Sequence, residues 1–118
     1  MAKLDACGEK VSLPVVAAEE HFRSWLAQIR RVNDVHKQII PYLRFQNLIA
    51  FLRKWDIVGW NEPAADEFKR LRAARARIGT QDLKIASLAL ANDALLLSAN
   101  LRDFEQVPGL RVESWLDG

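Results

Sequence analysis

The sequence predicts an α/β fold. Short apolar runs alternate along the chain with longer segments of helical periodicity, a pattern typical of a parallel sheet covered by helices. The length of 118 residues fits one domain. Half of the residues are hydrophobic and 27% are charged, which is a globular composition that can bury a core. We therefore treat residues 1–118 as a single domain.

The first half of the chain predicts a strand and two helices. Residues 11–16 form a short apolar run typical of a buried strand, which Pro14 weakens. Residues 18–29 follow with apolar side chains at helical spacing. Residues 35–55 continue this periodicity, and Pro41 is expected to kink or split that helix near Ile40.

The second half predicts three strands and two helices. Ile57 and Val58 form a very short strand, and Asn61 is a good N-cap for a helix that runs to about residue 76. Thr80 is expected to cap the next helix, which runs to about residue 92 and is apolar nearly all round. Residues 94–97 and 110–112 are the last two predicted strands. A short loop is expected to connect the first of them to Asp103.

The composition excludes several classes of site. Cys7 is the only cysteine, so neither a disulfide nor a cysteine-based zinc site can form within the chain. The chain has only two histidines, fifteen residues apart, and two are too few for a histidine-rich metal site. Charged residues interrupt every apolar stretch before membrane-spanning length, and we expect no membrane partner and a cytoplasmic location. The net charge of +2 does not by itself demand a nucleic-acid partner.

Acidic residues are predicted to converge at one edge of the sheet. Glu19 and Glu20 follow the first strand, Asp103 follows the 94–97 strand, and Asp82 lies in the first turn of a helix. In parallel sheets, ligands bind beyond the carboxyl ends of the strands. Converging carboxylates suit Mg²⁺ or Mn²⁺, which prefer oxygen ligands. Each acid also has an ordinary structural role, as a first-turn or turn residue, and Glu19 competes with Glu20.

Three segments carry a family resemblance: RIGTQDLKIA (residues 77–86), LSANLRDF (97–104) and VPGLRVESW (107–115). This pattern closely resembles the C-terminal half of PIN domains, specifically the toxin ribonucleases of the VapC type. VVAAEE (15–20) is similar to the family's second strand and acidic helix start. The resemblance covers residues 12–115 and implies a three-layer fold with a short central parallel sheet flanked by helices.

The resemblance also implies a function. Glu20, Asp82 and Asp103 fall on the family acids that hold Mg²⁺ or Mn²⁺, and Asn100 and Ser98 fall on polar positions that support them. The implied activity is that of an endoribonuclease toxin of a type II toxin–antitoxin system. The implied partners are an RNA substrate, a cognate antitoxin protein and a second copy of the chain in a homodimer or strand-exchanged oligomer.

One part of the family pattern is missing. The family's first strand ends in an aspartate, usually within Leu-Asp-Thr, about forty residues before the glutamate. Leu4-Asp5-Ala6 is similar but lies only fifteen residues before Glu20, so we assign residues 2–10 to the end of a helix and expect an N-terminally truncated domain. The exposed edge would be filled by a second copy, by exchange of an element or by local rearrangement.

This loss leaves two functional hypotheses. The site lacks one of four acids, so the expected ribonuclease activity is impaired. The alternative is a catalytically inactive remnant that acts as a binding or oligomerisation module.

Basic and aromatic residues are the remaining candidates. Arg72, Arg75 and Arg77 precede the Gly79-Thr80 break and suit RNA phosphates. Their ordinary alternative is a solvated helix face with pairs such as Asp66–Arg70. The four tryptophans are expected to be core or interface anchors, and the helices around Trp25 and residues 39–52 to form the homodimer surface.

Overall fold

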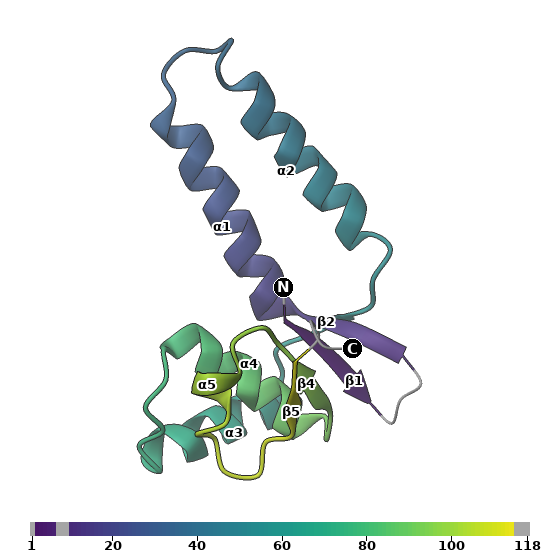
Figure 1. Ribbon diagram of the computed structural model, residues 1–118, viewed down its shortest axis with the longest axis vertical. Coiled ribbons are helices and arrows are strands. Elements are labelled where there is room, and N and C mark those ends of the chain that lie inside the picture. Colours follow the sequence, from purple (N-terminus) through teal and green to yellow (C-terminus); the bar gives the residue numbers. More distant parts are fainter. Residues whose placement is uncertain (1, 7–9, 115–118) are drawn as a thin grey trace.

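The computed structural model describes residues 2–6 and 10–114. Its elements in chain order are β1 (Lys3–Ala6), β2 (Lys10–Pro14), α1 (Val15–Arg31), α2 (Ile39–Leu52), β3 (Ile57–Val58), α3 (Glu62–Ala73), α4 (Thr80–Ala91), β4 (Leu95–Leu97), α5 (Leu101–Phe104) and β5 (Val112–Glu113). The strands form one sheet in the order β3-β2-β1-β4-β5, as Figure 1 shows in part. The predicted α/β fold is therefore confirmed.

The central strand β1 corrects the prediction for the N-terminus. Residues Lys3–Ala6 form a strand rather than the end of a helix. β1 pairs antiparallel with both β2 and β4, whereas β2–β3 and β4–β5 are parallel pairs. The sheet is thus mixed, with four parallel strands and one reversed strand at its centre. Of the three ways expected to fill the central position, the structure shows local rearrangement within the chain.

The core lies between the sheet and the helices α3 and α4. Leu4 and Leu96 are paired across β1 and β4, so their buried side chains point to the same face of the sheet. They belong to one cluster with buried residues of both helices, such as Leu71 and Leu88. Six residues of α4 are buried, which confirms the prediction that this helix is enclosed. This packing fixes the first turn of α4 against the sheet edge.

The helices α1 and α2 form a hairpin that projects from the body of the molecule (Figure 1). Buried residues of α1 lie mainly in its first turn, and α2 has none. An edge-to-face contact between Phe22 and Phe45, with ring centroids 5.2 Å apart, joins the two helices. The hairpin explains the radius of gyration of 15.8 Å, since a compact domain of this length has about 13.5 Å.

Several local predictions can be compared with the structure. Asn61 caps α3, and its side-chain oxygen accepts a hydrogen bond from the Ala64 N–H. Pro41 lies in the first turn of α2, which begins at Ile39 and is therefore split from the preceding turn as expected. The cap of α4 is Gly79, so the prediction for Thr80 was wrong.

The structure also answers predictions made for single residues and for membrane-spanning helices. The expected short loop after β4 is formed by residues 98–100, and Asp103 then lies in the short helix α5. Arg70 pairs with Glu67 at 2.7 Å, not with Asp66. Cys7 and Trp115 lie outside the described residues. In the part of the chain that the structure describes, no helix is both long and apolar enough to cross a membrane.

Candidate metal centre

The predicted acids come from three elements that meet at one edge of the sheet. Glu20 lies in α1, which begins directly after Pro14 at the end of β2. Asp103 lies in α5, just beyond the end of β4, and Asp82 lies in the first turn of α4. Because β2 and β4 run parallel to each other, their carboxyl ends meet at the same edge.

Asp82 interacts electrostatically with each of the other two acids. Burial raises the pKa of Asp82, and the negative charge of Asp103 raises it further. Burial also raises the pKa of Glu20, with additional contributions from Asp82 and then Glu19. Asp82 is therefore the acid that the other two have in common as a neighbour. A cation would relieve this repulsion, so the donor chemistry fits a divalent metal ion.

The carboxylate groups of the three acids do not surround a common point. Within residues 2–6 and 10–114, no group of three or more His, Cys, Asp and Glu side chains is arranged to hold a metal ion. The acids share an edge and influence one another, but their oxygen atoms are not converged. The assignment of Glu20, Asp82 and Asp103 as metal ligands accordingly stays a prediction.

Ser98 and Asn100 connect the end of β4 to Asp103. The Asn100 side-chain amide donates a hydrogen bond to Asp103 Oδ2 at 3.1 Å. The Asn100 backbone N–H donates to Ser98 Oγ at 3.0 Å, and Ser98 is buried. This chain of contacts orients the Asp103 carboxylate from a buried anchor. The supporting role that the resemblance assigns to these two residues in a metal site stays a prediction.

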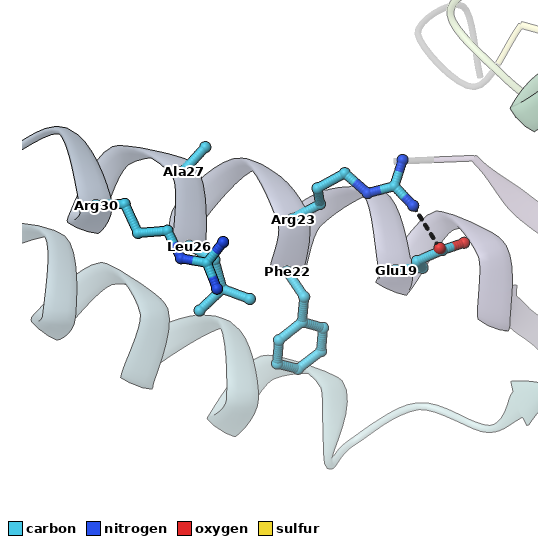
Figure 2. Close-up of a pocket in the computed structure, with 6 residues that line it drawn as sticks. All are labelled: Glu19, Phe22, Arg23, Leu26, Ala27 and Arg30. Atoms are coloured by element: carbon cyan, nitrogen blue, oxygen red, sulfur yellow. Dashed lines mark hydrogen bonds and ion pairs between the residues drawn. The ribbon is translucent and has the colours of Figure 1, made fainter.

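The structure separates the roles of Glu19 and Glu20. Glu19 is exposed and accepts hydrogen bonds from Gln81 at 3.1 Å and from Arg23 at 2.6 Å. Figure 2 shows its ion pair with Arg23 on the surface of α1. The Gln81 hydrogen bond is the largest of the effects that lower the pKa of Glu19. Glu20 instead is half-buried and interacts with Asp82, so Glu20 is the better candidate ligand.

Gln81 is a residue of the site region that sequence reasoning missed. Its side chain connects α4 to α1, and it directly precedes Asp82 in the chain. The only signal in the sequence is this adjacency, because a glutamine in a first helical turn has no chemistry of its own that suggests a site.

The reversed direction of β1 places different side chains at the two ends of the sheet. Lys3 pairs with Leu97 at the site edge, whereas Asp5 pairs with Leu95 at the other end of β4. One carboxylate oxygen of Asp5, Oδ1, is buried without a hydrogen-bond partner. Asp5 therefore does not supply the acid that ends the first strand in the family pattern.

The arginines proposed for RNA are exposed at the end of α3 and in the segment that follows it. The guanidinium of Arg72 lies 5.6 Å from the centre of the Phe68 ring. Arg75 adopts a left-handed backbone conformation with φ of 58° directly after the C-cap of α3. Neither observation tests RNA binding, and this role stays a prediction.

Two open cavities lie along α1. One of about 330 Å³ is lined by Phe22, Leu26 and Ala27 together with charged residues, and Figure 2 shows Phe22 pointing toward α2. A second, of about 230 Å³, is lined by Glu20, His21 and Ser24. His21 is half-buried on α1, and this burial lowers its pKa.

Comparison with known proteins identifies relatives. No protein-family model matches the chain. The tRNA(fMet)-specific endonuclease VapC of Salmonella typhimurium is 30% identical over 88 residues, which cover 71% of this chain and 67% of that protein. Ribonuclease VapC2 of Rickettsia felis is 32% identical over 72 residues, and the match spans 54% of its length.

Solved structures show the same fold. The DNA-bound VapBC complex of Salmonella typhimurium matches with a TM-score of 0.71 and 24% identity, over 86% of this chain and 73% of the other. The VapBC2 complex of Rickettsia felis matches with a TM-score of 0.65 and 22% identity, over 88% and 74%. With this fold, and with 30% identity across two thirds of the Salmonella enzyme, the chain belongs to the VapC family of PIN-domain ribonucleases.

Proposed function

We propose that this chain is a divalent-metal-dependent endoribonuclease toxin of a toxin–antitoxin pair. The observation that carries the proposal is that three acids from α1, α4 and α5 lie at the carboxyl edge of the sheet. There burial, and then repulsion from neighbouring acids, raises the pKa of Glu20 and of Asp82. The names of the relatives, an endonuclease and ribonucleases, support the same class of reaction. Mg²⁺ or Mn²⁺ is the proposed ion.

Glu20, Asp82 and Asp103 would hold this ion. When bound, it would lower the pKa of a water molecule and stabilise negative charge on a phosphoryl oxygen. Asn100 keeps the Asp103 carboxylate oriented by its hydrogen bond to Oδ2. Arg72, Arg75 and Arg77 are exposed and would bind the phosphates of the RNA backbone.

We expect the activity to be lower than that of a site with four acids. Asp5 lies at the opposite end of β1 from the site, and Lys3 is paired at the site edge. Fewer carboxylates give weaker attraction for a divalent cation. An assay therefore needs millimolar metal before a negative result is meaningful.

The proposed protein partner is a cognate antitoxin. The structures with the same fold are VapBC complexes. In this chain α2 exposes large apolar side chains, among them Ile39, Ile40 and Leu43, which are more than half exposed. Such a surface is typical of a protein interface. A homodimer or a strand-exchanged oligomer and a cytoplasmic location remain predictions of the same hypothesis.

The test combines metal binding with RNA cleavage. We expect calorimetry to show Mn²⁺ binding by the wild type, Mn²⁺-dependent cleavage of RNA, and loss of both in Asp82→Asn. Asp66→Asn, which removes an exposed acid of α3, is the matched control and should retain both properties. A wild-type chain that binds no Mn²⁺ and cleaves no RNA would refute the enzyme and support the alternative of an inactive binding module.

A further inference from the structure

A hydrogen bond joins the two neighbours of the candidate ligands. Gln81 Nε2 donates to Glu19 Oε1 at 3.1 Å, between residues sixty-two positions apart in the chain. Glu19 directly precedes Glu20, and Gln81 directly precedes Asp82. We infer that Glu19 and Gln81 are a positioning pair, which fixes the separation of Glu20 and Asp82 across the α1–α4 contact. The inference rests on the proposed function, because it concerns the same site.

The packing of α1 explains why such a contact is needed. The base of α1 is held by buried Val16, Ala17 and Ala18, and its next buried residue is Ile29 near the far end. The helix therefore leaves the core at about the level of Glu19, and its outer part packs on α2, which has no buried residue. A helix anchored at one end can pivot about that end, and a pivot at Ala18 would displace Glu20.

α4 offers a rigid partner for the contact. Leu83, Ile85 and Ala86 are buried directly after Gln81 and belong to the main core cluster. A hydrogen bond from Gln81 therefore connects the part of α1 beyond its buried base to α4, which has six buried residues. It acts at the rim of the apolar contact, where it restricts rotation of α1 about its buried base.

The charges of the pair are suited to positioning rather than to metal binding. Gln81 is neutral and donates, so it adds no negative charge beside Asp82. The negative charge of Glu19 is balanced by Arg23, which pairs with it at 2.6 Å, and by the nearby charge of Lys84. Glu19 is thus engaged by Gln81 and Arg23, and Glu20 is the acid that interacts electrostatically with Asp82.

The first experiment measures Mn²⁺ affinity by calorimetry in a double-mutant cycle. We expect Gln81→Ala to weaken binding about three- to tenfold, since supporting contacts of this kind typically cost about tenfold or more when they are buried and less when they are exposed. In a Glu19→Ala background the additional effect of Gln81→Ala should vanish, because the partner is already gone. Gln28→Ala, which removes an exposed glutamine of α1, is the control and should bind as the wild type does.

The second experiment needs no metal. Spin labels at exposed Arg31 of α1 and Arg72 of α3, in a Cys7→Ser chain, report the orientation of the hairpin. Gln81→Ala should broaden the distance distribution, and Gln28→Ala should not. Unchanged Mn²⁺ affinity together with an unchanged distribution would overturn the inference. If the wild type binds no Mn²⁺ but Gln81→Ala still broadens the distance distribution, the proposed metal centre is refuted and the positioning pair stays supported.

Discussion

Replacing Asp82 with asparagine is expected to stabilise the metal-free protein while it abolishes metal binding. Asp82 is half-buried, and burial and the charge of Asp103 raise its pKa. A carboxyl group with a higher pKa in the folded chain than in the unfolded chain binds protons more readily when folded. Its ionised form therefore opposes folding at a pH above both values. Asparagine has nearly the same shape but no charge, so Asp82→Asn removes the unfavourable contribution of the ionised carboxylate to folding.

Two effects of opposite sign set the size of the gain. In the first turn of α4, a negative charge at Asp82 gains about 0.3–1 kcal/mol from the helix dipole. Repulsion between two unit charges 4 Å apart is about 1 kcal/mol in bulk water, and Asp82 interacts with both Asp103 and Glu20. The raised pKa shows that burial and repulsion prevail. Because Asp82 is partly exposed, we expect at most about 1 kcal/mol, or roughly 4 °C in Tm.

The assay is thermal unfolding at neutral pH in EDTA and again in Mn²⁺. Glu62→Gln is the control, because Glu62 also lies in a first helical turn but is exposed; it should lose up to about 1 kcal/mol of dipole stabilisation. The contribution of Asp82 and Glu20 to the free energy of unfolding should fall as the pH rises above their ordinary pKa values of 3.8 and 4.5, and this fall should be smaller in Asp82→Asn. Glu19, whose pKa is lowered, contributes with the opposite sign. A fall in Tm for Asp82→Asn in EDTA equal to that of Glu62→Gln would refute the argument.

Three other outcomes follow from the same structure. Arg75→Gly should raise the free energy of unfolding by up to about 1 kcal/mol in urea titration, since its φ of 58° disfavours residues with a Cβ atom; Arg77→Gly should not. Backbone amides of α2 should exchange with deuterium faster than those of α4, because α2 has no buried residue and α4 has six; equal protection would contradict this. Replacing Arg72, Arg75 and Arg77 together with glutamine should reduce the salt dependence of RNA binding by about 2 in log–log slope, with binding weakened for all sequences alike.

The elements that the sequence predicts well are those whose signal is local. Asn61 is a cap because its own side chain satisfies an N–H three residues away, and this needs no tertiary contact. The apolar run that became β4 follows from burial, because Leu96 is fully buried between partly buried neighbours. The acidic edge was predictable because parallel strands bring their carboxyl ends together. The prediction for Thr80 failed because Gly79, also able to cap, holds the extended conformation that a cap requires.

The features that escaped prediction depend on contacts distant in sequence. β1 has four residues, too few for a clear periodicity, and its direction is set by pairing with Leu96 and its neighbours ninety residues away. The contact of Gln81 with Glu19 likewise depends on how α1 meets α4. Whether three acids share one edge could be inferred, but how closely their oxygens converge depends on side-chain packing that a single sequence does not specify.

The reversed central strand explains how the fold can persist while the site changes. Pairing in a sheet uses backbone N–H and C=O groups, which a strand of either direction can supply. β1 can therefore form backbone hydrogen bonds with both β2 and β4. Side-chain chemistry does depend on direction. Reversal leaves Asp5 at the end of β4 that is distant from Ser98, and it turns Lys3 toward the Trp55 ring, 4.9 Å from its centre. The proposed cation binding at this edge would then depend on residues of α1, α4 and α5, which is why the geometry between α1 and α4 gains importance.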